Sequence, residues 1–106
     1  MKQYSLSELC AEIQEVVEND LLERYWVRAE IASLSARGHC YIELVEKAEN
    51  NMLAAKLRAT CWSNVYSLLS AYFIQETGQA LRVGMQVLVE VSVGFHPVYG
   101  LSLNIW

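Results

Sequence analysis

Between residues 26 and 62 the sequence alternates apolar and polar residues in three successive runs, separated only by short polar segments. A period of two is the pattern of β-strands that have one buried and one exposed face. Three such strands joined by short connections favour an antiparallel meander. The residues predicted to share the buried face are Val27, Ala29, Ile31, Cys40, Ile42, Leu44, Leu53, Ala55, Leu57, Ala59 and Cys61.

The segments that join these strands have the composition of turns. The first predicted turn is Leu34–Gly38, which ends on a glycine, and the second is the polar segment Glu46–Asn51. Glycine and small polar residues are typical of connections between strands. Two more strands are predicted further along the chain, at Gln86–Phe95, which is rich in β-branched residues, and at Tyr99–Trp106.

An N-terminal helix is predicted over residues 5–19. Ser5 and Glu8 have the spacing of a capping box, in which each side chain satisfies a backbone N–H group of the first turn. The acidic residues of this helix are expected to form a solvated face, and binding of a basic partner is the alternative. The apolar stripe at helical spacing consists of Leu6, Leu9, Ile13 and Val16.

A second helix is predicted between the third and fourth strands, because apolar residues recur at helical spacing from Trp62 to Phe73. Ser63 is its candidate cap and Gly78 its candidate end. The element order is therefore helix, three strands, helix, two strands. That order is typical of the OB-fold, a five-stranded antiparallel barrel of the all-β class, here with flanking helices. We expect a single domain over residues 1–106, with the barrel over about 25–106.

The net charge of −4 is distributed unevenly along the chain. Residues 1–23 contain six acids and one base, whereas the remaining residues contain six acids and seven bases. The acidity therefore belongs to the N-terminal segment. The predicted barrel is close to neutral, which leaves room for a locally basic surface in spite of the low isoelectric point.

The three cysteines, Cys10, Cys40 and Cys61, are odd in number and lack C-x-x-C spacing, which argues against a disulfide framework and a zinc site. We expect them to be reduced. No run approaches the ~18 apolar residues of a membrane span, and no signal-peptide pattern opens the chain. A cytoplasmic location without membrane contact is the expectation. No catalytic motif and no metal or cofactor site is apparent in these residues.

Five motifs, in order along the chain, carry a resemblance to a known family. They are YSLSEL at Tyr4–Leu9, WVRAEIA at Trp26–Ala32, RGHCYIEL at Arg37–Leu44, AKLRATCW at Ala55–Trp62 and GMQVLV at Gly84–Val89. Together they resemble the N-terminal OB-fold domain of the large subunit of exodeoxyribonuclease VII. Each motif alone is weak, whereas their order over nearly the whole chain is fairly specific.

The resemblance implies a single-stranded DNA-binding domain of a bacterial enzyme. The domain would guide the strand to a downstream nuclease region that hydrolyses phosphodiester bonds, and the small subunit of the complex would be a further partner. We therefore expect the chain to be part of a longer polypeptide and not to be catalytic by itself. The chain departs from the family by losing positive charge, since Glu90 and Ser63 stand where basic residues are frequent.

The polar faces of the first three strands carry the residue types that hold single-stranded nucleic acid. Cations contact the phosphates, and aromatic rings stack on the bases. If the strands are neighbours, these side chains lie on one surface. The predicted nucleic-acid-binding residues are Arg28, His39, Tyr41, Lys56, Arg58 and Trp62.

Plainer interpretations exist for several of these residues. Arg28 can pair with Glu30 or Glu43 across the sheet. Trp62 can belong to the core, and His39 can merely shape the turn after Gly38. Two other functions also remain open. The domain can be a protein-interaction or assembly module that docks on another subunit through the acidic first helix or an exposed face of the barrel. It can also be an RNA-binding OB domain of the anticodon-binding kind.

Overall fold

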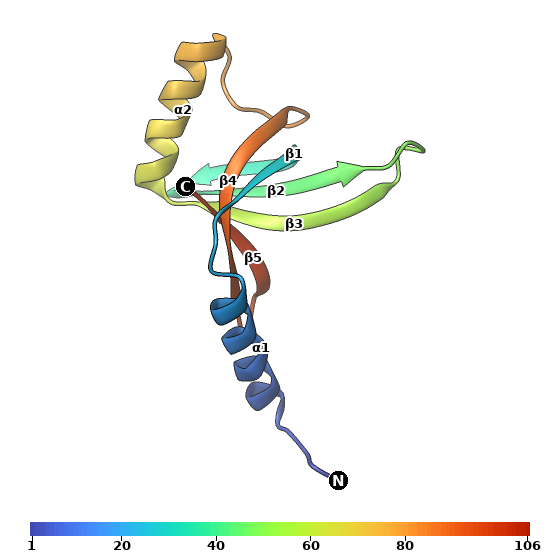
Figure 1. Cartoon of the computed structure of the whole chain (residues 1–106). Helices are drawn as coiled ribbons and strands as arrows, with labels where there is room; N and C mark the ends of the chain where they lie inside the picture. Colours follow the sequence, from blue (N-terminus) through green and yellow to red (C-terminus); the bar gives the residue numbers. More distant parts are fainter.

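The computed structural model describes all residues from Met1 to Trp106. Two helices and five strands follow one another along the chain (Figure 1). The elements are α1 (Leu6–Asp20), β1 (Tyr25–Arg37), β2 (His39–Lys47), β3 (Leu53–Cys61), α2 (Ser63–Thr77), β4 (Gln86–His96) and β5 (Gly100–Ile105).

The five strands close into a barrel in the order β1-β2-β3-β5-β4, which confirms the predicted OB-fold. The pairings are antiparallel except for the one between β3 and β5, which is parallel and closes the barrel. The long strand β1 pairs with β4 through its first half and with β2 through its second half. A bulge between Ile31 and Ser33 marks the change of partner, because an extra residue bends a strand and increases its twist.

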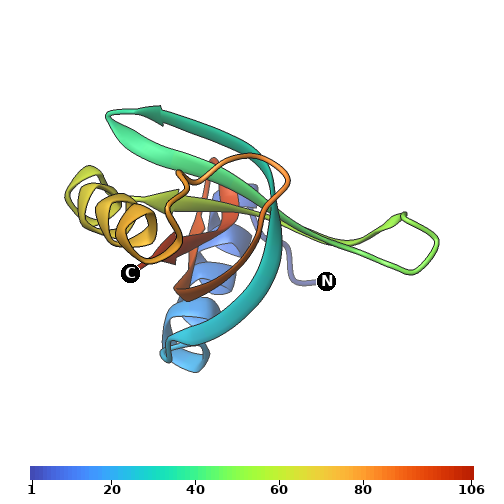
Figure 2. The ribbon, with the colours of Figure 1, turned by 90° about the horizontal axis from the view of Figure 1, so that it is seen from above.

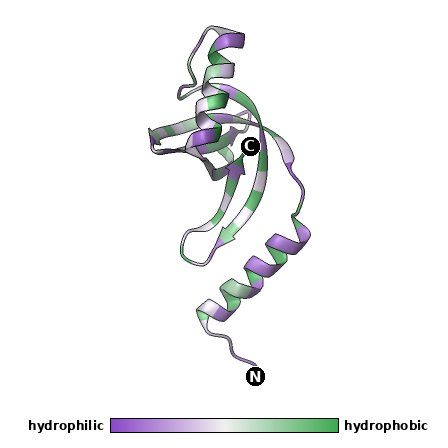
Figure 3. Ribbon diagram, turned by 90° about the vertical axis from the view of Figure 1, so that its left-hand side faces the viewer, coloured by the Kyte–Doolittle hydropathy of each residue, from purple (hydrophilic) through white to green (hydrophobic).

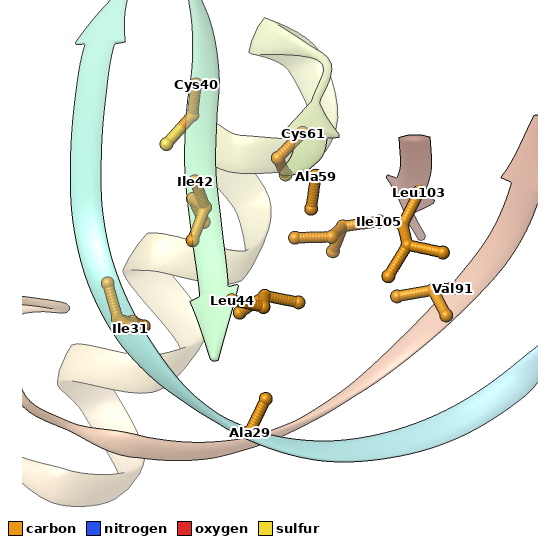
Figure 4. Close-up of a cluster of buried hydrophobic side chains, with 10 residues drawn as sticks. All are labelled: Ala29, Ile31, Cys40, Ile42, Leu44, Ala59, Cys61, Val91, Leu103 and Ile105. Carbon is orange, nitrogen blue, oxygen red and sulfur yellow. The ribbon is translucent and has the colours of Figure 1, made fainter. Parts of the chain in front are cut away.

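The barrel interior holds a cluster of ten buried apolar side chains (Figure 4). Seven of them are on the face that the alternation in β1, β2 and β3 predicted to be buried, and β4 and β5 supply the rest. The cluster consists of Ala29, Ile31, Cys40, Ile42, Leu44, Ala59, Cys61, Val91, Leu103 and Ile105.

The first half of β3 departs from the predicted burial. Leu53, Ala55 and Leu57 are exposed although they continue the apolar alternation of the strand. The reason is geometric: the hairpin of β2 and β3 extends beyond the barrel wall, as the green segment in Figure 2 shows. The hairpin ends in a turn in which Asn51 has a positive φ of 64°.

The predicted turn at Leu34–Gly38 is much shorter than expected. β1 continues to Arg37 and β2 begins at His39, so Gly38 alone separates them. Gly38 has a φ of 78°, in the left-handed region that a residue without a Cβ reaches at little cost. The polar run before it is therefore the end of a strand with both faces accessible.

Helix α2 covers one end of the barrel, where Val65, Tyr66 and Leu69 pack against the core cluster. Gly78 ends the helix in the left-handed conformation, as predicted. The prediction of Ser63 as the cap is wrong, because Trp62 occupies the N-cap position and makes no side-chain capping bond. The N–H of Ser63 instead donates to Nδ1 of His39, 3.0 Å away.

Helix α1 begins with the predicted capping box, in which Ser5 N–H donates to Oε1 of Glu8 and Glu8 N–H donates to Oγ of Ser5. The helix contacts β4 and otherwise extends away from the barrel (Figure 1). The radius of gyration is 16.0 Å, compared with about 13 Å for a compact chain of this length. Neither helix is long and apolar enough to cross a membrane.

Candidate nucleic-acid interface

A surface pocket of about 520 Å³ opens on the outside of the barrel, between the β2–β3 face and the hairpin of β4 and β5. Its lining combines large aromatic rings, one guanidinium group, two aliphatic hydroxyl groups and one imidazole. The lining residues are Tyr41, Arg58, Thr60, Trp62, His96, Tyr99 and Ser102.

The strand register explains why these residues meet. Tyr41 on β2 stands opposite Thr60 on β3, and Arg58 and Trp62 lie two residues to either side of Thr60 on the same outward face. The parallel pairing of β3 with β5 brings the β4–β5 hairpin alongside, because Thr60 is also opposite Asn104. Strands β2 and β3 and the β4–β5 hairpin therefore frame the pocket.

Arg58 joins the two sides of the pocket. Its Nη2 donates a hydrogen bond of 2.5 Å to the backbone carbonyl of Tyr99, which is 41 residues away in the sequence. A guanidinium group has five N–H donors in a fixed plane. The bond to Tyr99 orients this plane inside the pocket and leaves other donors for a ligand.

His39 and Trp62 form one unit at the edge of the pocket. Their ring centroids are 4.5 Å apart with an interplanar angle of 78°, an edge-to-face arrangement. Nδ1 of His39 accepts the Ser63 N–H, which leaves Nε2 as the ring nitrogen that faces other partners. The histidine thus caps the start of α2 and holds the indole of Trp62, which is more than its predicted alternative role of shaping the turn.

His96 organises the opposite edge in the same manner. Its Nδ1 accepts from the backbone N–H groups of Val98 and Tyr99, at 3.0 Å and 3.4 Å. Its ring also lies against the Tyr99 ring, with centroids 4.7 Å apart and an interplanar angle of 32°. These contacts fix the turn between β4 and β5 and turn Tyr99 toward the pocket.

The cations around the pocket differ in how far glutamates neutralise them. Nζ of Lys56 lies 3.3 Å from Oε1 of Glu43, the residue beside it on the sheet. Arg58 has no carboxylate partner, and neither has Arg28. The alternative in which Arg28 pairs with Glu30 or Glu43 does not hold, because those glutamates pair with Lys47 and Lys56.

The structure brings together most, but not all, of the residues predicted from the sequence. Tyr41, Arg58 and Trp62 line the pocket, and His39 supports Trp62. Lys56 lies two residues from Arg58 on the same outward face of β3. Arg28 lies elsewhere, opposite Leu88 of β4, in a separate depression of about 110 Å³ that Lys56 also lines.

Sequence reasoning missed four lining residues: Thr60, His96, Tyr99 and Ser102. Thr60 alternates correctly with Arg58 and Trp62, so the period of two was sufficient to find it. The other three come from the β4–β5 hairpin. Their signal was weaker, an aromatic residue and a histidine on either side of the only proline.

Comparison with known proteins agrees with the fold and with the character of the pocket. A family model described as "OB-fold nucleic acid binding domain" matches residues 4–106. The chain is also similar to the "Exodeoxyribonuclease 7 large subunit" of Deinococcus radiodurans, with 39% identity over 105 residues. The alignment covers 94% of this chain and 25% of that protein, so the chain spans a quarter of its relative. The resemblance indicated by the five sequence motifs is thereby confirmed.

Proposed function

We propose, because this chain belongs to the family of OB-fold nucleic acid binding domains, that it binds single-stranded DNA in the pocket between the β2–β3 face and the β4–β5 hairpin. The observation that carries the proposal is the convergence of three aromatic rings and one oriented guanidinium in a single concave site. Aromatic faces and cations are the two elements by which proteins hold single strands without sequence preference.

The aromatic side chains supply the base-binding part of the site. Tyr41, Trp62 and Tyr99 remain exposed although each is large and partly apolar. Tyr41 and Trp62 lie on the β2–β3 side and Tyr99 on the hairpin side, so a base that enters has rings on both sides. Stacking contributes about 1–3 kcal/mol per base. A duplex hides these base faces, which favours a single strand as the ligand.

The electrostatic part of the site is modest. Arg58 is free of carboxylates, whereas Lys56 is partly neutralised by Glu43. Two phosphate contacts to a single strand correspond to a slope of about −1.4 in a plot of log K against log salt, at about −0.7 per contact. Such a surface guides a strand more than it retains one. Hydrolysis would belong to a nuclease region elsewhere in a longer polypeptide, with a small subunit as a further partner, consistent with the name of the relative.

The test is fluorescence anisotropy with a labelled oligo-dT at low and high salt. Replacing Tyr41 or Arg58 by alanine is expected to weaken binding about tenfold, the loss of one stacked base or one charged contact. Arg82→Ala and Tyr72→Ala are matched controls, because Arg82 and Tyr72 are exposed and lie outside the pocket. Absence of binding at low salt, or binding that is independent of salt, would contradict the proposal.

Ribonucleic acid is the second ligand that the same chemistry accepts, since stacking and phosphate contacts do not distinguish the sugars. Competition of unlabelled oligo-U against bound oligo-dT measures the preference. We expect oligo-dT to compete better. Stronger competition by oligo-U would show that the same pocket prefers RNA as its ligand.

A further inference from the structure

Helix α1 leaves an apolar stripe uncovered. Its barrel-facing side is formed by Cys10, Gln14 and Val17, of which Val17 alone is buried. The neighbouring side carries four apolar residues that are 77%, 44%, 37% and 58% exposed, in chain order. These four residues, called the α1 seam below, are Leu6, Leu9, Ile13 and Val16.

The spacing of the α1 seam is that of a helix-pairing surface. Its members are separated by three, four and three residues, which is the a/d spacing of a heptad repeat. Hydrophobic and hydrophilic bands alternate along the projecting helix in Figure 3. Fifteen residues correspond to about two heptads of contact. The seam therefore has both the length and the periodicity needed to pack against another helix.

The charges on α1 indicate what that other helix must carry. Between Leu6 and Asp20 the helix has five acids and no base, and none of these acids takes part in an ion pair. Glu12 lies beside the seam, because it follows Leu9 by three residues and precedes Val16 by four. The acids include Glu8, Glu12, Glu15, Glu18 and Asp20.

Two features of this charge arrangement are unfavourable for the helix alone. Glu8 and Glu12 are like charges at i and i+4, a spacing at which they repel. Glu18 and Asp20 lie in the last turn, where the helix dipole favours cations, and no base is present there. A cationic partner would relieve both, and a second α1 would aggravate both.

We propose that the α1 seam is a docking surface for a basic amphipathic helix of a partner chain. The apolar face of the partner would cover Leu6, Leu9, Ile13 and Val16, and its lysines or arginines would face the carboxylates of α1. This surface is separate from the proposed DNA pocket, because no residue of α1 lines that pocket. The domain would thereby join a nucleic-acid strand on one side to a helical partner on the other.

The probe is a designed, labelled peptide of about three heptads with leucine at positions a and d and lysine at e and g. Lysine flanks prevent the peptide from pairing with itself at neutral pH. We expect saturable binding to the chain by anisotropy, weakened at least tenfold by Leu9→Asp, which places a charge within the seam. Glu12→Lys is expected to weaken peptide binding similarly. It leaves the apolar residues of the seam unchanged and acts only through the flanking charge.

Three controls give each outcome a meaning. The same peptide with glutamate in place of lysine is expected not to bind. Leu68→Asp is the matched substitution on α2, at a leucine that is 75% exposed and outside the seam, and it should change nothing. Oligo-dT binding by Leu9→Asp and Glu12→Lys should equal that of the unmodified chain, which also shows that the barrel is folded.

Several results would overturn the proposal. They are the absence of saturable binding of the basic peptide, equal binding of the acidic peptide, and peptide binding that Glu12→Lys leaves unchanged. Light scattering could also show a dimer of the chain at neutral pH that Leu9→Asp abolishes. That result would assign the seam to a second copy of the chain and would overturn the proposal of a basic partner helix. Should Leu9→Asp loosen α1 from the barrel, the Glu12→Lys variant decides, because Glu12 is exposed.

Discussion

The barrel encloses a ten-residue apolar core among five strands, whereas α1 buries a single side chain, Val17, where it contacts β4. The two regions also differ in charge. All three ion pairs of the chain lie outside α1, and the barrel has nearly equal numbers of acids and bases. The helix, in contrast, carries five acids that have no counterion.

This difference indicates that the barrel is stabilised by contacts among its own strands, whereas α1 makes few contacts with the rest of the chain. The barrel encloses its own core of buried apolar side chains, and it leaves no buried side-chain nitrogen or oxygen atom without a hydrogen-bond partner. Helix α1 satisfies its own first turn through the capping box and leaves most of its apolar surface exposed. We infer that the barrel unfolds as the cooperative unit of the chain and that substitutions in α1 leave the stability of the barrel nearly unchanged.

The largest effect should come from the barrel core. Ile31 is 1% exposed, and Ile31→Ala is expected to lower the free energy of unfolding by about 2–5 kcal/mol through lost burial and a residual cavity. The matched change in α1 is Ile13→Ala, where the side chain is 37% exposed and the loss should be below about 1 kcal/mol. Urea denaturation measures both. Equal losses would mean that α1 belongs to the cooperative core.

The next effect is an alkaline loss of stability that belongs to the barrel alone. Burial, with a smaller contribution from the charge of Cys40, raises the pKa of the Cys61 thiol from 9.0 to about 11. In the unfolded chain the thiol ionises at its ordinary pKa, so the unfolded state binds fewer protons between these values. The stabilisation is present below pH 9 and declines as the pH rises to 11, by an amount on the order of 2 kcal/mol.

Denaturation midpoints between pH 8 and pH 11, compared with those of Cys61→Ala, measure this loss. The unmodified chain should lose stability more steeply than the variant. Cys10→Ala is the control, because Cys10 is not buried, and its profile should follow that of the unmodified chain. Parallel profiles for the unmodified chain and Cys61→Ala would contradict the assignment.

A smaller effect is expected where the pocket meets α2. His39→Phe retains a ring against Trp62 but removes the acceptor for the Ser63 N–H, which leaves the first turn of α2 without a side-chain cap. The cost should be about 1 kcal/mol, together with a change in Trp62 fluorescence. The matched change on the other edge, His96→Phe, frees two loop N–H groups and should leave α2 intact. Equal effects of both variants on α2 would contradict this role of His39.

The sequence predicted the features that depend on neighbours along the chain. The capping box of Ser5 and Glu8 and the buried alternation around Ile31 and Ile42 follow from local spacing, and both are confirmed. Leu53 and Leu57 were predicted to be buried but are exposed. Alternation shows which residues share a face of the strand, but it does not show whether that part of the strand lies within the barrel. Pairing between β3 and β5 likewise has no local signature.

The same limit applies to the pocket. Tyr41, Arg58 and Trp62 were found because they lie on adjacent strands of a meander, in which pairing follows sequence order. His96 and Tyr99 were not, because the parallel closure that brings them to Arg58 joins segments 41 residues apart. Arg28 does not line the pocket that contains Arg58, because the half of β1 that carries it pairs with β4.

The smallest effect should be confined to α1. Hydrogen bonds from the backbone and side chain of Ser5 lower the pKa of the Glu8 carboxyl group from its usual 4.5. The ionised carboxylate therefore stabilises the helix start above that value, and this contribution is lost as the pH falls through the lowered pKa. Ser5→Ala removes the Oγ atom that accepts the Glu8 backbone N–H, the other half of the capping box, and should destabilise the helix by about 1 kcal/mol at neutral pH. Amide hydrogen exchange of the first turn of α1 measures both changes, while exchange in the barrel strands should remain unaltered. Faster exchange in β4, the strand that contacts α1, would show that the helix and the barrel unfold together.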